Sequence, residues 1–249
     1  MAYFENMRTN LKTLVSSFDA SGLLLSLSGI VAGILFAFAE YHVNWGTALA
    51  LILTVLPMHI YMQTSGKLWM AASVAGAFLT VYLSYSTLFS LESLLLLLFS
   101  YFIIRMAKGI GDGSKVMDGV LCCFLRGPVA LVGAYFVCTH SFPFWLLILP
   151  ALSIGLLCAA TEGTKAGYGR NILTLLIFAA ILLMLSFSVL RIFFWLHFIF
   201  AAIIPVFVIL IVRMYKEKEQ DPGGYRHILA LSTFLFALLA GIGFAGHLL

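Results

Sequence analysis

The sequence predicts an all-α, polytopic membrane protein, and three observations support this fold class. The chain has 249 residues, of which 63% are hydrophobic and only 10% are charged, and its mean hydropathy is +1.09. A soluble domain of this length could not bury so much apolar surface, so the expected solvent is a lipid bilayer. The apolar runs are long and unbroken, which favours helices over the ten-residue alternating strands of a membrane barrel.

The apolar runs predict nine transmembrane helices in a single domain that covers residues 20–249. Each run is close to the ~20 residues that a helix needs to cross ~30 Å of hydrocarbon. The predicted spans are 21–39, 45–63, 68–88, 91–107, 117–138, 142–160, 171–190, 192–213 and 227–248.

Residues 1–19 precede the first span and show a helical repeat of apolar side chains. They lack the continuous apolar core of a signal peptide. A helix that lies in the membrane interface suits this amphipathic pattern. The repeat consists of Phe4, Met7, Leu11, Leu14, Val15 and Phe18.

The basic residues predict the orientation of the bundle. Twelve of the 14 Lys and Arg residues lie in the N-terminal segment or in the loops that follow even-numbered spans. Such a bias places the N-terminus in the cytoplasm and the C-terminus outside, and we expect an integral protein of a bacterial inner (cytoplasmic) membrane. The net charge of +4 is spread over short segments at one face, so it does not indicate binding to nucleic acid.

The cysteines and membrane-embedded histidines suggest no cofactor. Cys122, Cys123, Cys138 and Cys158 lie in apolar spans, at spacings that suit neither a zinc site nor a disulfide framework. The predicted topology places two histidines inside spans near opposite membrane faces, which excludes a shared haem iron. These histidines are His59 and His197.

Two adjacent apolar runs carry a family resemblance. Only Thr139, His140 and Ser141 separate Met117–Cys138 from Phe142–Ala160, so the two spans must be antiparallel neighbours. The stretch FLRGPVALVGAYFV, a short turn and LPALSIGLLCAA resembles spans five and six of the UbiA superfamily of membrane prenyltransferases, closest to the branch that prenylates dihydroxynaphthoate for menaquinone. The resemblance implies a UbiA-like bundle of nine helices. It also implies two Asp-rich motifs, after spans two and six, that hold Mg²⁺ and the diphosphate of a prenyl donor.

Both metal motifs of that family are missing from this chain. The end of span two reads PMHIYMQTSGKLW, without an acidic residue, and Glu162 is the only acid between Cys158 and Asn171. Asp112, Asp118 and Glu162 could form a reduced cation site, or they could be solvated acids near Lys108 and Lys115. We predict no cofactor, with Mg²⁺ needed only if the protein is an active transferase.

Arg126 is the candidate residue that lies deepest in the predicted membrane. It lies about nine positions, or ~13 Å, into its span, where a charge requires a partner or a wet cavity. It could grip an anion such as a phosphate, a carboxylate or a quinone oxygen, or it could form an ion pair with Glu162 or Asp118. Further candidates for anion binding are Lys165, Arg170, Asn171, Lys108 and Lys115.

The segment YKEKEQDPGGYRH mixes charges of both signs and suits docking of a partner. Its candidate contact residues are Lys216, Lys218, Tyr225 and Arg226.

These observations together predict a divergent UbiA-like protein without catalytic activity. It would bind a lipid, isoprenoid or quinone and act as a subunit or scaffold beside another membrane protein. One alternative is an active prenyltransferase, or a related lipid transferase, that uses Arg126, Lys165 and loop acids. A second alternative is a small transporter or channel.

Overall fold

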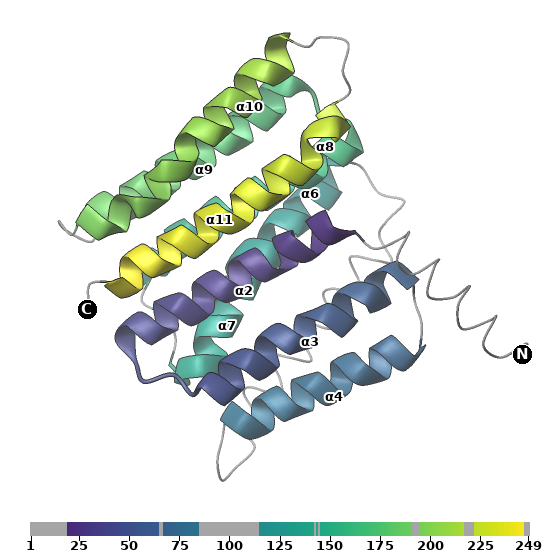
Figure 1. Cartoon of the computed structure of the whole chain (residues 1–249), viewed down its shortest axis with the longest axis vertical. Coiled ribbons are helices and arrows are strands. Elements are labelled where there is room, and N and C mark those ends of the chain that lie inside the picture. The colour runs from purple at the N-terminus through teal and green to yellow at the C-terminus, as the bar shows by residue number, and fades with distance from the viewer. Residues whose placement is uncertain are drawn as a thin grey trace, which may run out of the picture.

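A computed structural model describes residues 19–64, 67–84, 115–141, 143, 145–190, 195–216 and 222–246 of the chain. Every element among these residues is a helix, which confirms the predicted all-α fold class (Figure 1). The elements are α2 (Ala20–Glu40), α3 (Trp45–Thr64), α4 (Lys67–Ser84), α6 (Lys115–Phe124), η1 (Leu125–Val129), α7 (Ala130–Thr139), η2 (Trp145–Leu147), α8 (Ile148–Ala166), α9 (Arg170–Leu190), η3 (Trp195–Ile203), α10 (Ile204–Lys216), η4 (Pro222–Tyr225) and α11 (Arg226–Ala245).

Six helical stretches in the described part of the chain are long and apolar enough to cross a membrane, as an integral membrane protein requires. Two shorter apolar helices, Trp45–Tyr61 and Leu68–Thr80, accompany them. The predicted interfacial helix before residue 19 and the predicted span 91–107 lie outside the described residues. The six long stretches are Ala20–Glu40, Gly119–Thr139, Trp145–Ala166, Arg170–Leu190, Leu196–Lys216 and Arg226–Ala245.

One helix boundary differs from the prediction in a way that matters for the site. The span predicted to end at Ala160 continues as α8 to Ala166. It ends where Gly167 adopts the left-handed conformation, with φ of 74°, and the amide of Tyr168 donates to the carbonyl of Gly163 at 2.8 Å. Glu162 and Lys165 therefore lie on a helix and not in a loop.

Successive spans run in alternating directions, so the bundle has two ends. One end, called the charged end below, contains Asp19 and Arg226 at the starts of α2 and α11 and Glu162 near the finish of α8. The other is the far end, where the side-chain amide of Asn44 donates to the carbonyl of Leu83 at 3.2 Å. Thus α4 finishes at the far end, whereas Gly119 of α6 lies beside Tyr168 at the charged end. The predicted topology requires this change of end between the two helices.

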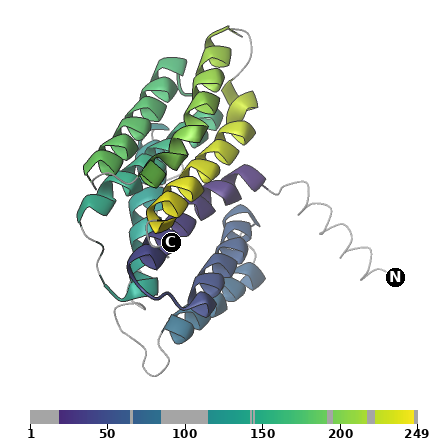
Figure 2. The same ribbon diagram turned by 60° about the vertical axis from the view of Figure 1, so that its left-hand side comes forward.

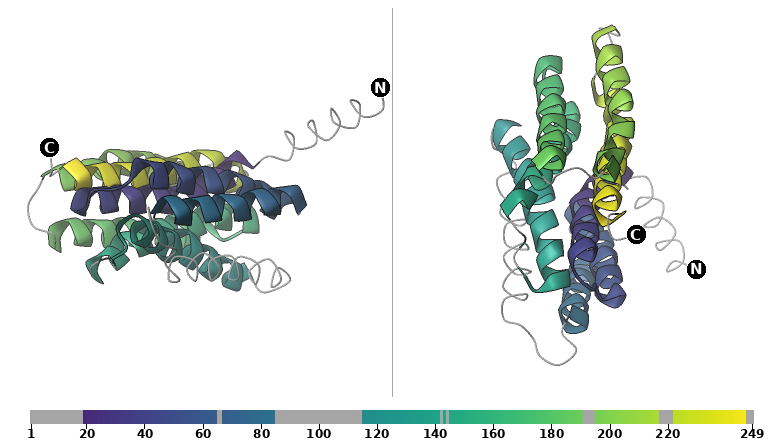
Figure 3. Two further views of the ribbon diagram at one scale, coloured as in Figure 1. Left: turned by 90° about the horizontal axis from the view of Figure 1, so that it is seen from below. Right: turned by 90° about the vertical axis from the view of Figure 1, so that its left-hand side faces the viewer.

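Helix α2 lies in the middle of the bundle. It packs along α11 on one side and α3 on the other, and it also contacts α7 and α8. Figure 3 shows the α10, α11, α2 and α3 helices as one layer and the α6–α9 segment as a second layer against it. The turned view in Figure 2 shows α4 beside α3 at the edge of the molecule. At the core, the buried ring of Phe36 makes edge-on contacts with Phe187 of α9 and Phe244 of α11.

Glycines allow the central helices to approach closely. A Cβ atom on Gly29 would lie 2.3 Å from the carbonyl oxygen of Arg126, and one on Gly33 would lie 2.3 Å from that of Leu131. Gly127 of η1 makes the equivalent approach to Ala151 of α8, and Gly155 of α8 makes it to Cys123 of α6. Small residues at such crossings bring backbones into van der Waals contact, which is the main source of helix association inside a bilayer.

The helix that contains Arg126 changes its winding at that point. Residues Leu125–Val129 form a π-helical turn, with Pro128 inside it. Proline has no amide hydrogen to donate, and a π turn is one way in which a helix accommodates such an interruption. The amide of Ala130, which follows the turn, donates to the carbonyls of Gly127 and Leu125. Arg126 therefore projects from an irregular turn, directly opposite α8.

Candidate functional site

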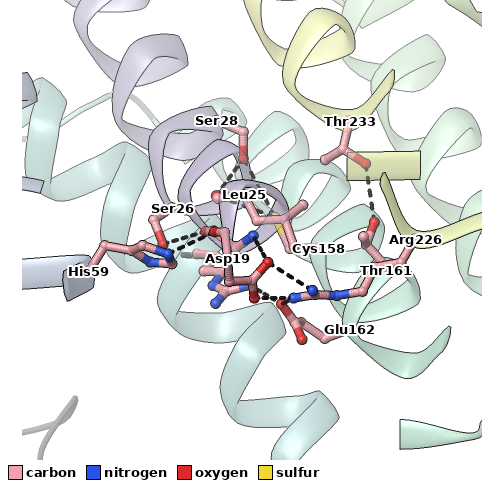
Figure 4. A network of polar contacts seen from close by, with 12 residues as sticks. Asp19, Leu25, Ser26, Ser28, His59, Cys158, Thr161, Glu162, Arg226 and Thr233 are labelled. Atoms are coloured by element: carbon pink, nitrogen blue, oxygen red, sulfur yellow. Dashed lines mark hydrogen bonds and ion pairs between the residues drawn. The ribbon is translucent and has the colours of Figure 1, made fainter. Parts of the chain in front are cut away.

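Four charged side chains meet at the charged end of the bundle. They are Asp19, Arg126, Glu162 and Arg226, which we call the charged cluster. Figure 4 shows how Asp19, Glu162 and Arg226 converge with their polar neighbours. The four residues come from the start of α2, from η1, from the last turns of α8 and from the start of α11. Side chains from four separate segments therefore form one continuous ionic network.

Asp19 and Arg226 form a two-pronged ion pair. The Nη1 atom of Arg226 donates to Oδ1 of Asp19 at 2.8 Å, and Nη2 donates to Oδ2 at 2.6 Å. Such paired contacts use the planar guanidinium and carboxylate fully and are the strongest type of side-chain hydrogen bond. Only 12% of the Arg226 side chain and 23% of the Asp19 side chain are exposed, so solvent screens this pair less than an open surface pair.

Asp19 also begins α2. Its Oδ1 atom accepts a hydrogen bond from the amide of Gly22 at 3.0 Å, as the side chain of an N-cap residue does. Burial alone would raise the pKa of Asp19. The hydrogen bonds from Arg226 and Gly22 outweigh that effect and lower the pKa to about 2. The carboxylate is therefore ionised at neutral pH, next to the positive end of the helix dipole.

Glu162 accepts hydrogen bonds from two arginines. Its Oε1 atom receives Nη1 of Arg126 at 2.9 Å and Nη2 of Arg226 at 2.9 Å. The Glu162 and Arg126 side chains are 24% and 26% exposed. Two guanidinium groups and two carboxylates make the cluster neutral overall. That balance lowers the cost of placing charges at the end of an apolar bundle.

Polar contacts around the charged cluster extend it to further helices. Nε2 of His59, near the end of α3, lies 2.9 Å from the backbone carbonyl oxygen of Asp19. Oγ of Ser21 lies 2.5 Å from Nδ1 of His227 and joins α2 to α11 a second time. Deeper in the bundle, Thr161 of α8 contacts Thr233 of α11 through their hydroxyls at 3.4 Å. These contacts link α2 to α3 and to α11, and α8 to α11.

The structure brings some sequence candidates together and separates others. Arg126 and Glu162 form the ion pair that was one of the two interpretations of Arg126. Arg226 and Tyr225, named as docking candidates, lie in the interior, where Tyr225 is 6% exposed. Lys165 is exposed in the last turn of α8.

The remaining candidates lie at the ends of other helices or outside the described part of the chain. Asn171 begins α9 with Arg170, and its Oδ1 atom accepts from Oη of Tyr215 at 2.5 Å. Lys216 is the exposed last residue of α10. Lys115 and Asp118 lie on α6, where the structure describes the backbone but not their side chains, and the following three lie outside the described residues: Lys108, Asp112 and Lys218.

Chemically, the charged cluster pairs its own charges. Each carboxylate accepts a hydrogen bond from an arginine, and Nη1 of Arg126 donates to Glu162. Among the described residues, no group of three or more His, Cys, Asp and Glu side chains is arranged to hold a metal ion. The arrangement is therefore well suited to joining helix ends, and its two positive and two negative groups balance one another.

A smaller polar contact lies at the far end. The hydroxyl of Tyr135 donates to Oε2 of Glu40, and Tyr135 itself is 1% exposed. The pair connects α7 to the last residue of α2. Polar links between α2 and its neighbours thus exist at both ends of the bundle.

Comparisons of this chain with protein-family models, with curated proteins and with solved structures found no match.

Proposed function

We propose that this protein is a non-catalytic, lipid-binding subunit or scaffold of a membrane assembly, with a lipid, isoprenoid or quinone as its ligand. In this proposal the chain has nine spans in a UbiA-like bundle. Its long apolar helices place it in the membrane. Its function is to hold a ligand and a partner, without chemical turnover.

The observation that carries the proposal is the internal pairing of the charged cluster. Arg126 is the candidate for gripping a substrate anion, and its guanidinium donates to Glu162. Glu162 in turn also accepts from Arg226, whose other contacts go to Asp19. A transferase of the resembling family needs open cationic and metal-held positions for diphosphate. Here the charged groups satisfy one another.

The position of the charged cluster supports the comparison with that family. In UbiA-type enzymes the metal motifs follow spans two and six. The corresponding positions in this chain are the end of α3, which carries His59, and the end of α8, which carries Glu162. His59 contacts the backbone carbonyl of Asp19. Glu162 pairs with both Arg126 and Arg226. We propose that protein ion pairs replace the metal–diphosphate contacts at this end.

The distribution of basic residues supports a cytoplasmic charged end. Lys67 and Lys115 begin helices there, Lys165 and Lys216 finish helices there, and Arg170 begins α9. Lys and Arg accumulate on the cytoplasmic side of membrane proteins. The proposal therefore places the charged cluster at the cytoplasmic face of a bacterial inner membrane, with the N-terminus on that side and the C-terminus outside.

The test is purification from native membranes into nanodiscs, followed by mass spectrometry of the proteins and lipids that co-purify. The expected result is a stoichiometric membrane-protein partner together with a bound lipid, isoprenoid or quinone. The purified sample should show no prenyl transfer, with or without Mg²⁺. Metal-dependent transfer, or a chain that carries neither partner nor ligand, would overturn the proposal.

A further inference from the structure

A second polar cluster lies at the charged end of the bundle, where α9 meets α10. It is separate from the charged cluster. Arg170 and Asn171 begin α9, and Arg213 and Lys216 lie in the last turn of α10. The hydroxyl of Tyr215 donates to Oδ1 of Asn171 at 2.5 Å and holds the two helix ends together. Arg213 and Lys216 are exposed and three positions apart, so they share one helix face.

The helices that carry these residues are the least covered of the six long spans. The stretches Arg170–Leu190 and Leu196–Lys216 have the smallest buried share among them. Their exposed side chains are large and apolar, and on α9 they recur at helical spacing. These side chains are Ile172, Leu175, Phe178 and Leu182 on α9 and Val208, Ile209 and Val212 on α10.

The apolar and the basic surfaces adjoin each other. Ile209 lies one helical turn before Arg213, so an exposed apolar side chain and a cation share one face of α10. A molecule that fits both surfaces has a negative head at the level of the helix ends and hydrocarbon chains along the apolar faces.

We propose that the α9–α10 end is a binding site for an anionic phospholipid, with the phosphate at Arg170, Arg213 and Lys216 and the acyl chains along α9 and α10. This inference rests on the proposed lipid-binding function and names a lipid class and a place for it. It concerns a surface other than the charged cluster. Charge complementarity selects the anionic lipid over a zwitterionic one of the same chain length.

The test is native mass spectrometry of the purified full chain, titrated with phosphatidylglycerol or with phosphatidylcholine of identical chains. The probe variant is Arg213→Gln with Lys216→Gln. Its control is Lys67→Gln, which removes a charge at the same end from α4. A basic residue near an anionic surface strengthens binding roughly fivefold. The probe variant should therefore bind phosphatidylglycerol about 25-fold more weakly, whereas the control variant should stay within about twofold of wild type.

A charge reversal tests the sign of the effect. Arg213→Glu with Lys216→Glu should weaken phosphatidylglycerol binding further than the probe variant does, because like charges then face the phosphate. Equal affinity of wild type for the two lipids would overturn the site. Equal losses of phosphatidylglycerol affinity in the probe and control variants would also overturn it. So would a probe variant that keeps its lipid affinity but loses a protein partner.

The failure of this site and the failure of the proposed function give different results. Lipid titration measures only the site, whereas co-purification and turnover assays measure only the role in an assembly. If the wild-type protein transfers prenyl groups and the probe variant binds phosphatidylglycerol more weakly, the lipid site is supported and the proposed non-catalytic function is refuted.

Discussion

Arg226 grips both carboxylate oxygens of Asp19, a residue 207 positions earlier in the chain. The contact joins the start of α2 to the start of α11, the first and last helices that the structure describes. These two helices also pack along each other, so the ion pair fixes their relative height in the bundle. A second link between the same helices, from Ser21 to His227, reinforces that register.

Replacement of Arg226 by lysine should destabilise the bundle although the charge is kept. Lysine cannot make the paired contact with Asp19 and also reach Glu162, because it lacks the planar fork of the guanidinium. The expected loss is about 1.5–3 kcal/mol, the value of hydrogen bonds to charged groups. Unfolding in mixed micelles measures it, with Arg213→Lys at an exposed site as the control. Equal stability of the two variants would contradict this role of Arg226.

Neutralisation of Glu162 should cost more stability than neutralisation of Arg126. Glu162→Gln leaves two guanidinium groups facing a neutral amide. Arg126→Gln leaves Glu162 still paired with Arg226. Breaking a half-buried charge network by removing its shared partner is the more costly change. Thermal unfolding of both variants in the same detergent gives the order directly, and the reverse order would refute the shared-acceptor geometry.

Substitution of Gly127 by alanine should be strongly destabilising. Its added Cβ would lie 2.3 Å from the carbonyl oxygen of Ala151, and backbone atoms cannot move aside cheaply. We expect a loss of about 1–3 kcal/mol. Gly133→Ala is the matched control, because nothing lies within 4 Å of its added methyl group. That variant should stay within about 0.5 kcal/mol of wild type, and similar losses at both sites would show that α8 does not approach η1 as described.

Acid should weaken the link between α2 and α11 through Asp19. Hydrogen bonds from Arg226 and Gly22 outweigh the effect of burial and hold the folded-state pKa near 2, below the ordinary value of 3.8. The stabilisation is therefore complete above about pH 4 and is lost as the pH falls through 2. Asp19→Asn should flatten this part of the stability profile, measured by unfolding between pH 5 and 2. A profile for Asp19→Asn that matches wild type would contradict the assignment.

Much of the helical framework was predictable from hydropathy alone. The predicted span 171–190 corresponds to α9 at Arg170–Leu190, and the span 21–39 to α2 at Ala20–Glu40, because unbroken apolar runs have clear polar boundaries. The end of α8 was placed six residues early. The polar stretch after Ala160 looks like a loop, and the signal that marks the true end is Gly167, preceded by Lys165 in the last turn.

The charged cluster was only partly predictable. A charge inside a span requires a partner, and this rule predicts Glu162 or Asp118 as the partner of Arg126. Asp19 carries a local signal too, since an aspartate directly before an apolar helix is a typical N-cap. Its pairing with Arg226 carries no local signal. The two residues meet only because α2 and α11 pack together, and one sequence contains no record of that packing.

The most direct test of the central claim is the set of lipids and proteins that co-purify with Arg126→Met in nanodiscs. If Arg126 serves the bundle through its ion pair with Glu162, the folded variant should keep the same partner and the same bound lipid as wild type. Loss of a phosphorylated isoprenoid or another anionic ligand from a folded Arg126→Met protein would contradict this claim. It would identify Arg126 as a ligand-binding residue and make a prenyl-transfer assay the next experiment.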